Sequence, residues 1–236
     1  MKFKGFNKSS LIEYPEKIVS VVFTGGCNFR CPFCHNKDLV LNPDKIPDIT
    51  EKEIIDYIEK KRKWIDGIAI TGGEPTLHKE LPAFIKRIKD KGFLVELETN
   101  GTNPEMIKQL IDDNLVDYLA MDIKAPLEEK KYYQVIGKSG DKKKILDNIK
   151  KTINIIQKSG VDYEFRTTFV PGLLTKEDIY AIAEQLKGSK RYVIQKFLPN
   201  NNIDPEYEKK DTLKPGFFEE FKEKLKDYFD EIIIKA

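Results

Sequence analysis

The chain has 236 residues, 34% of them charged, and its 41 Lys and Arg nearly balance its 39 Asp and Glu. This length fits one large domain or two small ones, and the net charge of +2 gives no global field of the kind that attracts nucleic acid. Because no apolar run approaches the about 20 residues that cross a bilayer, and no secretory signal opens the chain, we expect a cytoplasmic protein that binds neither membrane nor nucleic acid.

Strand and helix patterns alternate from residue 18 to the end of the chain. In chain order they predict a strand at 18–24, a helix at 50–63, a strand at 67–71, a helix at about 78–91, a strand at 93–99, a helix from 104, a strand at 116–123, a short helix before 140, a helix at 142–159, a strand at 161–170, a helix at 175–186, a strand at 191–197, a helix at 215–228 and a short edge strand at 231–234. The polar stretch 200–210 is predicted to be a long loop.

Two helix starts carry clear capping signals. Thr50 precedes Glu53 in the spacing of a capping box, and Asn103 stands directly before Pro104 at the first helical position. Six strand–helix repeats predict an α/β fold, a partial (β/α)6 barrel of the TIM type with a parallel sheet and outer helices. The count is short of the eight strands of a closed barrel. No linker divides the pattern, so we expect a single domain over residues 1–236.

Polar and glycine-rich residues gather where the predicted strands end. A cysteine-rich loop follows the first strand and Gly72-Gly73-Glu74-Pro75 follows the second, while Thr99-Asn100-Gly101 ends the third. Asp122 and Lys124 close the fourth strand, and alternation sends both side chains to one side. Parallel α/β folds place their active sites at the carboxyl ends of strands. We therefore expect these residues to surround one site.

The chain's three cysteines, Cys27, Cys31 and Cys34, lie within eight residues. In a reducing compartment an odd, clustered set favours metal or redox chemistry over structural disulfides. A [4Fe–4S] cluster normally takes four cysteines, one per iron. Three thiolates therefore leave one iron open to a ligand that is not protein.

Other interpretations use fewer of the thiols. Cys31 to His35 match the C-x-x-C-H of c-type haem attachment, and Cys31 with Cys34 match a redox dithiol, but both leave Cys27 without a role. Structural zinc with His35 or His78 as fourth ligand is a further alternative, although zinc sites more often use two separated ligand pairs. We favour the cluster, which uses all three.

The cysteine motif, with Phe33 before its last cysteine, resembles the signature of the radical S-adenosylmethionine superfamily. The surrounding residues 24–36, and the opening Gly5-Phe6 through Leu11-Ile12-Glu13-Tyr14-Pro15, resemble the glycyl-radical-enzyme activases. The likeness is strongest to the longer type of anaerobic ribonucleoside-triphosphate reductase activating protein. It implies an enzyme that reductively cleaves S-adenosylmethionine at a [4Fe–4S] cluster to place a glycyl radical on a partner, with ferredoxin or flavodoxin as electron donor.

The resemblance also implies roles for particular residues. The cluster ligands would be Cys27, Cys31 and Cys34. Glu74 would contact the methionyl amine, Lys124 the cofactor carboxylate, and Asp122 would hold Lys124 or a small cation. The implied cofactor-binding set is Phe33, Gly72, Gly73, Glu74, Thr99, Asn100, Asp122, Lys124 and Arg166. Glu98 departs from the pattern if the family uses Asp there as a cation ligand.

Structural alternatives stand beside these roles. The two glycines also suit a tight strand–helix turn, Asn100-Gly101 is a good turn, and Asp122 with Lys124 would make a structural ion pair. For the whole chain, the alternatives are an activase of the pyruvate formate-lyase type, a radical S-adenosylmethionine enzyme acting on a small molecule, such as 7-carboxy-7-deazaguanine synthase, and a zinc-binding module without catalysis. The last six residues contain no glycine, so we expect the radical-bearing glycine on another protein.

Overall fold

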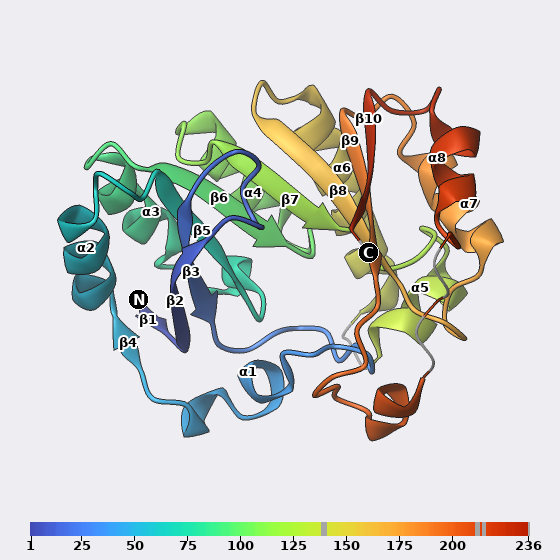
Figure 1. The fold of residues 1–236 in the computed structure, drawn as a ribbon, viewed down its shortest axis with the longest axis horizontal. Helices are drawn as coiled ribbons and strands as arrows, with labels where there is room; N and C mark the ends of the chain where they lie inside the picture. The colour runs from blue at the N-terminus through green and yellow to red at the C-terminus, as the bar shows by residue number, and fades with distance from the viewer. Residues whose placement is uncertain (138–140, 211–212, 214–215, 236) are drawn as a thin grey trace.

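The computed structural model describes residues 1–137, 141–210, 213 and 216–235. One sheet holds eight strands in the order β10-β9-β8-β7-β6-β5-β3-β2 (Figure 1). Its strands are β2 (Gly5–Ser10), β3 (Val19–Thr24), β5 (Gly67–Gly72), β6 (Leu94–Thr99), β7 (Tyr118–Asp122), β8 (Asp162–Phe169), β9 (Arg191–Lys196) and β10 (Glu231–Lys235). The short strands β1 (Lys2–Phe3) and β4 (Ile49–Thr50) pair separately and antiparallel.

Helices connect the strands, with α2 toward the β2–β3 end of the sheet and α7 and α8 toward the β9–β10 end (Figure 1). The α-helices are α1 (Lys37–Leu41), α2 (Glu51–Lys60), α3 (Leu81–Lys89), α4 (Pro104–Asp112), α5 (Glu129–Ile136), α6 (Lys142–Lys158), α7 (Lys176–Gln185) and α8 (Glu219–Leu225). Short 3₁₀ turns stand at Pro43–Lys45, Pro75–Leu77 and Pro205–Lys209.

The predicted α/β fold is confirmed. Strands β3, β5, β6, β7, β8 and β9 run parallel and neighbour one another in chain order, as successive strand–helix repeats require. The predicted edge strand is present as β10, parallel to β9. The result is the wall of a partial barrel, with β10 and β2 as its unpaired edges.

Both predicted helix caps are confirmed. Thr50 Oγ1 accepts from the backbone N–H of Glu53 at 3.2 Å, and the Glu53 carboxylate accepts from the Thr50 N–H at 2.7 Å. Asn103 Oδ1 accepts from the N–H of Met106 at 3.2 Å. These bonds satisfy donors that the first helical turn leaves free.

The structure differs from the prediction in several elements. Strand β2 was not expected, because its Gly-Phe-Asn-Lys-Ser-Ser sequence has no alternating apolar pattern; it is held as an antiparallel edge by pairing with β3. The helix expected from residue 78 begins at Leu81, after a 3₁₀ turn opened by Pro75. The last helix covers Glu219–Leu225, and residue 215, its expected start, lies outside the described residues.

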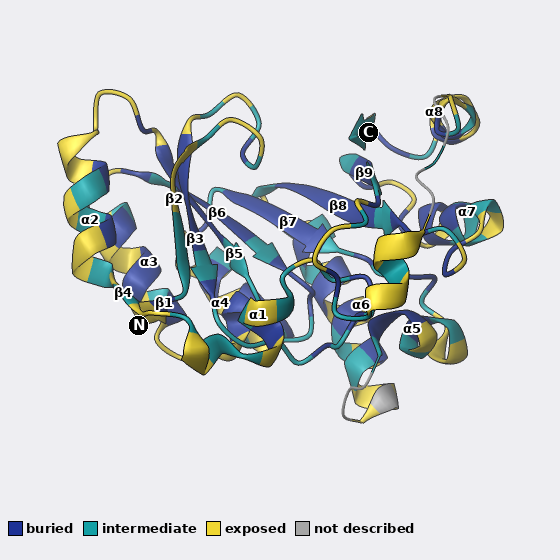
Figure 2. Ribbon diagram, turned by 60° about the horizontal axis from the view of Figure 1, so that its bottom comes forward, coloured by how far each residue is buried: buried dark blue, intermediate teal, exposed yellow. Residues whose placement is uncertain are grey.

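The two faces of the sheet differ in polarity. Alternate strand residues such as Ile68, Ile70 and Leu97 pack with the helices in the main apolar core. The opposite face begins as a small apolar cluster at the amino ends of the strands, covered by Tyr14 from the β2–β3 loop. Figure 2 shows the central strands β6, β7 and β8 as largely buried. Farther along the strands, this second face becomes polar.

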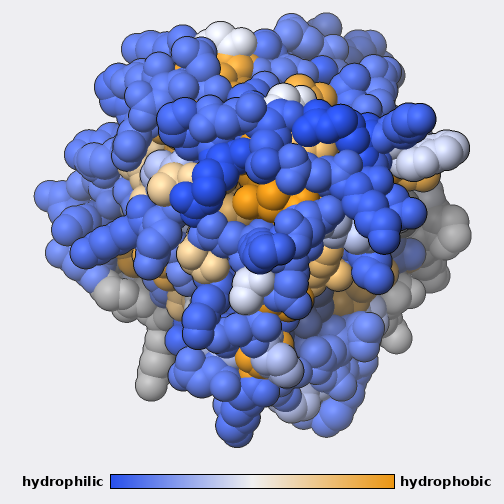
Figure 3. All heavy atoms as spheres, turned by 90° about the vertical axis from the view of Figure 1, so that its left-hand side faces the viewer, coloured by the Kyte–Doolittle hydropathy of each residue, from blue (hydrophilic) through white to orange (hydrophobic). Residues whose placement is uncertain are grey.

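The surface is mostly hydrophilic on the side that carries α2 and the amino terminus, with small separate apolar areas (Figure 3). Among the most exposed apolar side chains, Leu11 and Ile12 at the tip of the β2–β3 loop are each 73% exposed. In the part of the chain that the structure describes, no helix is both long and apolar enough to cross a bilayer.

Candidate metal and cofactor site

The three cysteines lie on the loop that leaves the carboxyl end of β3. All three are free thiols; Cys31 is buried, whereas Cys27 and Cys34 are partly exposed. Among the described residues, no three His, Cys, Asp or Glu side chains converge closely enough to hold a single metal ion. A cluster that takes one thiolate per iron does not need such convergence, because each thiolate binds a different iron.

Burial opposes ionisation of these thiols. It raises the pKa of Cys27 to about 11 and that of Cys31 to about 12, and it also raises the pKa of Cys34. The Lys124 ammonium lowers all three pKa values in part, and backbone N–H groups of Phe29 and Asn36 act in the same direction on Cys27 and Cys34. Metal binding must displace the thiol protons. A nearby cation and aimed N–H groups are what three thiolates on one loop require, so the residues fit the cluster.

The root of the cysteine loop packs directly against Gly72 and Gly73. The N–H of Gly73 donates to Thr24 O at 2.9 Å, and the N–H of Glu74 donates to Gly26 O at 2.8 Å. A Cβ on Gly73 would lie 1.8 Å from Gly26 O, and one on Gly72 would lie 2.4 Å from Thr24 N. The close approach that needs glycine is therefore made by the cysteine loop. Contact of these residues with a cofactor stays a prediction.

Glu74 is buried, and its carboxylate ties the end of β5 to the end of β6. It accepts hydrogen bonds from Thr76 N at 3.1 Å, Thr76 Oγ1 at 2.5 Å, Thr99 Oγ1 at 2.8 Å and Asn100 N at 2.7 Å. Burial raises the pKa of Glu74, and these donors oppose that rise. The geometry makes Glu74 a positioning residue for Thr99 and Asn100. Its predicted contact with the cofactor amine remains untested.

Asn100 joins the β6 turn to the cysteine loop. Its Nδ2 donates to Asn28 Oδ1 at 2.8 Å and lies 4.0 Å from Cys27 Sγ. Asn28 Nδ2 in turn donates to Thr102 Oγ1 at 2.9 Å. This amide pair fixes the first half of the cysteine loop, so the structure brings Thr99 and Asn100 to the predicted site.

Asp122 and Lys124 point to the same side and form the expected pair, with Lys124 Nζ 2.7 Å from Asp122 Oδ2. Burial works against the charge of Lys124, but Asp122 and the neighbouring Cys31 outweigh it and raise the pKa of Lys124. A lysine that stays charged beside the thiols suits an anionic ligand. The contact with a cofactor carboxylate stays a prediction.

Arg166 lies inside β8, and three carboxylates surround its guanidinium. Its guanidinium bonds to the carboxylates of Glu98 and Glu164 and to Glu96 Oε1 at 3.1 Å. Burial raises the pKa of Glu96, and Arg166 lowers it in part. The protein itself therefore supplies these anions, and the assignment of Arg166 to the cofactor stays a prediction.

Phe33 and the two histidines are also placed. The Phe33 side chain is 7% exposed and belongs to the main core, so a contact with adenine, if made through this residue, is left to its backbone. His35 is exposed, and His78 Nε2 lies 3.0 Å from Gly25 O at the root of the cysteine loop. Neither histidine is placed as a fourth metal ligand.

A second segment at the site was not predicted. Residues 201–204, from the loop after β9, bond to the carbonyls of residues 32–35. Apart from Ile203, residues 199–205 are polar or Pro, and they do not indicate a partner about 170 positions earlier. The asparagine run at 200–202 was the one local signal that could have drawn attention to it.

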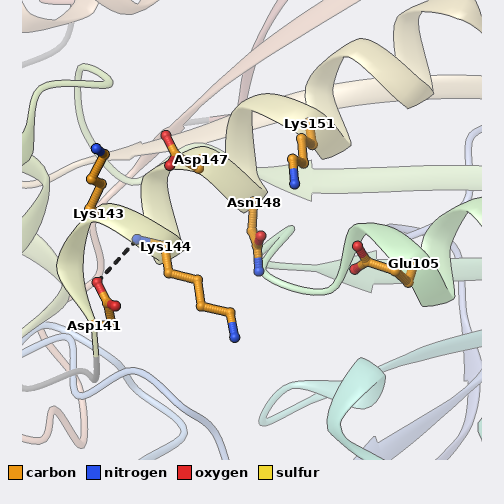
Figure 4. Close-up of a pocket in the computed structure, with 7 residues that line it drawn as sticks. All are labelled: Glu105, Asp141, Lys143, Lys144, Asp147, Asn148 and Lys151. Atoms are coloured by element: carbon orange, nitrogen blue, oxygen red, sulfur yellow. Dashed lines mark hydrogen bonds between the residues drawn. The ribbon is translucent and has the colours of Figure 1, made fainter.

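A surface pocket of about 470 Å³ lies between α4 and the start of α6 (Figure 4). Its lining mixes both charges: Glu105, Asp141, Lys143, Lys144, Asp147, Asn148 and Lys151. It meets the site through Asn148, whose Nδ2 donates to Thr102 O at 2.9 Å. No cysteine lines it, and the cluster site is separate from this hollow.

Residues 21–186 match the radical SAM superfamily. A Methanocaldococcus jannaschii protein provisionally named as a glycyl-radical enzyme activating enzyme is 39% identical over 96% of this chain and 92% of its own length. The 7-carboxy-7-deazaguanine synthase of that organism is 30% identical over 75% of this chain and 74% of its own length. The pyruvate formate-lyase-activating enzyme of Clostridium pasteurianum is 27% identical over 79% of this chain and 76% of that enzyme.

A solved structure shares the fold. SuiB of Streptococcus suis bound to S-adenosylmethionine aligns with a TM-score of 0.66 at 15% identity. The alignment covers 91% of this chain and 49% of SuiB, so this chain spans about half the length of that protein.

Proposed function

This chain belongs to the radical SAM superfamily, whose enzymes bind S-adenosylmethionine and a [4Fe–4S] cluster, and we propose that it is an activase that places a glycyl radical on a partner enzyme. The observation that carries the proposal is the 39% identity, over 96% of this chain, to a relative named as an activating enzyme. The likeness to a pyruvate formate-lyase-activating enzyme supports the same reaction.

Some residues of the site would bind the cluster or the cofactor, and others keep those residues in position. The thiolates of Cys27, Cys31 and Cys34 would hold three irons, with the fourth open to the cofactor. When bound, the cluster and S-adenosylmethionine supply the radical that removes a hydrogen atom from the partner's glycine. Lys124, kept charged by Asp122, would meet the cofactor carboxylate, and Glu74 would keep the β6 turn in place beside it.

We propose an anaerobic ribonucleoside-triphosphate reductase as the partner. Support comes from the β2–β3 loop, whose Leu11 to Pro15 resemble the activating proteins of that enzyme. This loop reaches the polar face of the sheet: Glu13 O accepts from Arg166 Nη2 at 3.3 Å, and Arg166 pairs in register with Asp122. Leu11 and Ile12 at the tip of this loop are exposed and would contact a partner that docks on the loop. Ferredoxin or flavodoxin is the proposed electron donor.

The test is anaerobic mixing of the reconstituted, reduced protein with S-adenosylmethionine and the reductase. We expect 5′-deoxyadenosine and a glycine-centred EPR doublet on the reductase, and neither with Cys27→Ala. If S-adenosylmethionine is cleaved but the glycyl radical forms on a pyruvate formate-lyase-type enzyme and not on this reductase, the proposed partner is wrong and the activase function stands. A folded protein that binds zinc and does not cleave S-adenosylmethionine would contradict the proposed activase function.

The second candidate is an enzyme that acts on a small molecule. It is favoured by the 30% identity to 7-carboxy-7-deazaguanine synthase over three quarters of the chain. Incubation with the substrate of that synthase, without any partner protein, separates the two. Substrate-dependent turnover there, with no glycyl radical on any partner, would replace the activase proposal.

A further inference from the structure

Residues 201–204, which we call the strap, run along the second half of the cysteine loop. Four consecutive carbonyls of that loop each accept a hydrogen bond from the strap, two from its backbone and two from its side chains. The bonds are Asp204 N to Pro32 O at 2.9 Å, Asn202 Nδ2 to Phe33 O at 2.7 Å, Ile203 N to Cys34 O at 3.0 Å and Asn201 Nδ2 to His35 O at 3.4 Å.

Asn202 is the buried centre of the strap. Its side chain is 0% exposed, and its Oδ1 has no hydrogen-bond partner among the described residues. The reversed amide orientation would set this oxygen against the oxygen of Phe33, so the Nδ2 must face the loop. A buried oxygen without a donor costs free energy. The hydrogen bond from Asn202 Nδ2 to Phe33 O offsets this cost.

The strap also affects whether backbone carbonyl or N–H groups of the cysteine loop point toward the thiols. In a planar trans peptide the C=O and the following N–H point in opposite directions. The His35 carbonyl points to Asn201, so the following N–H, that of Asn36, points the opposite way, on the side of the Cys34 sulfur. Hydrogen bonds to ligand sulfurs are among the features that set the potential of an iron–sulfur cluster. Carbonyls held by the strap are therefore kept away from that sulfur.

The first half of the loop is braced from elsewhere. The N–H of Arg30 donates to Ile136 O at the end of α5 at 2.9 Å, and Asn100 reaches Asn28. Beyond the segment, Asn36 Nδ2 donates to Gly72 O at 3.1 Å. Between these braces, the carbonyls of residues 32–35 are held by the strap.

We propose that Asn202 is a positioning residue for the iron–sulfur cluster, and that it acts through the Phe33 carbonyl to hold the Cys31–Cys34 turn in place. The proposal depends on the cluster of the superfamily and is independent of which partner or substrate the enzyme serves.

The test compares Asn202→Ala and Asn202→Asp with Asn200→Ala in the reconstituted protein. Asn200 is exposed on the same loop and serves as the matched control. Loss of one buried hydrogen bond should speed iron loss to a chelator about tenfold in Asn202→Ala. Asn202→Asp should lose iron faster still, because it sets a carboxylate against the Phe33 oxygen. The EPR g-values and the midpoint potential of the cluster should shift in both variants and stay unchanged in the control.

Hydrogen exchange of the unaltered holoenzyme provides a second test, which does not depend on a variant that folds. The amides of Ile203 and Asp204 should be protected from exchange, because each donates to a carbonyl of the cysteine loop. Asn202 variants with wild-type iron retention, potential and EPR spectrum would overturn the proposal, as would unprotected strap amides in the holoenzyme. A variant that loses thermal stability but keeps the cluster potential and spectrum would mark Asn202 as merely structural and would also overturn it.

Discussion

At the scale of single residues, several positions of the site make contacts within the protein that their sequence motifs did not predict. Gly73 is needed because the carbonyl of Gly26 approaches it, and Glu74 is fully occupied by four donors from the protein. Arg166 is shared by three carboxylates. Each of these residues shapes the site by holding a neighbour. Their direct contacts with a cofactor are separate predictions.

Gly73→Ala should destabilise the protein by about 1–3 kcal/mol through overpacking, because the new methyl group would collide with backbone that cannot move without shifting the cysteine loop. At roughly 2–4 °C per kcal/mol for a chain of this size, the melting temperature should fall visibly. Gly160→Ala is the control, since a Cβ there meets nothing within 4 Å. Equal melting temperatures for the two variants would contradict the packing role of Gly73.

Glu96 predicts a pH dependence. Burial raises its folded pKa above the ordinary 4.5 while Arg166, Glu98, Glu164 and Glu13 surround it. A raised folded pKa contributes stability that is full below the unfolded pKa and is lost as the pH rises through the folded pKa. Glu96→Gln stays neutral and keeps an oxygen for Arg166. The variant should therefore gain stability relative to wild type between about pH 5 and about pH 8.

Urea midpoints at both pH values would measure this gain. The exposed Glu105→Gln serves as the control and should show no pH-dependent difference from wild type. A constant difference between Glu96→Gln and wild type across the range would show that Glu96 has an ordinary pKa.

At the scale of elements, helix starts and strand ends together build the site. The caps at Thr50 and Asn103 follow directly from local sequence, and both form as expected. The Asn103 side chain makes a second hydrogen bond besides the cap: its Nδ2 donates to Thr76 O at 2.8 Å, close in sequence to Glu74. One amide thus starts α4 and fastens the turn that follows β5.

Asn103→Ala should therefore cost more than Thr50→Ala. Removing a cap costs about 1 kcal/mol, and the lost bond to Thr76 O adds roughly another 1 kcal/mol. Chemical denaturation of the two variants measures the difference. Identical losses would mean that the bridge from α4 to Thr76 contributes nothing.

At the scale of the molecule, the fold and the site rest on different contacts. The main core is formed mostly by side chains of the strands and helices, and Phe29, Cys31 and Phe33 of the cysteine loop join it. The backbone of the cysteine loop is held by the braces from β5, β6, α5 and the strap. The site is thus a set of loops placed on a preformed scaffold, which is the usual arrangement in parallel α/β enzymes.

Removal of iron should loosen these loops and leave the scaffold folded. Hydrogen exchange should accelerate at residues 25–36, 99–102 and 201–204, while the amides of β6 and β7 keep their protection. Far-ultraviolet circular dichroism should change little. Global unfolding on chelation, as in small zinc domains, would show that the scaffold depends on the metal.

The order of the parallel strands, the helix caps, the grouping of the cysteines and the polar strand ends could all be predicted from the sequence. These are local patterns, because hydrophobic period, capping residues and ligand spacing all act within a few positions. The tertiary structure alone decided that β2 pairs at the edge, that Glu74 and Arg166 are occupied by protein partners, and that the strap holds the cysteine loop. The bonds of Glu74 to Asn100, of Arg166 to Glu96 and of Asn202 to Phe33 join residues 26, 70 and 169 positions apart. Only the folded chain brings such distant donors and acceptors within hydrogen-bond reach, so no local pattern encodes them.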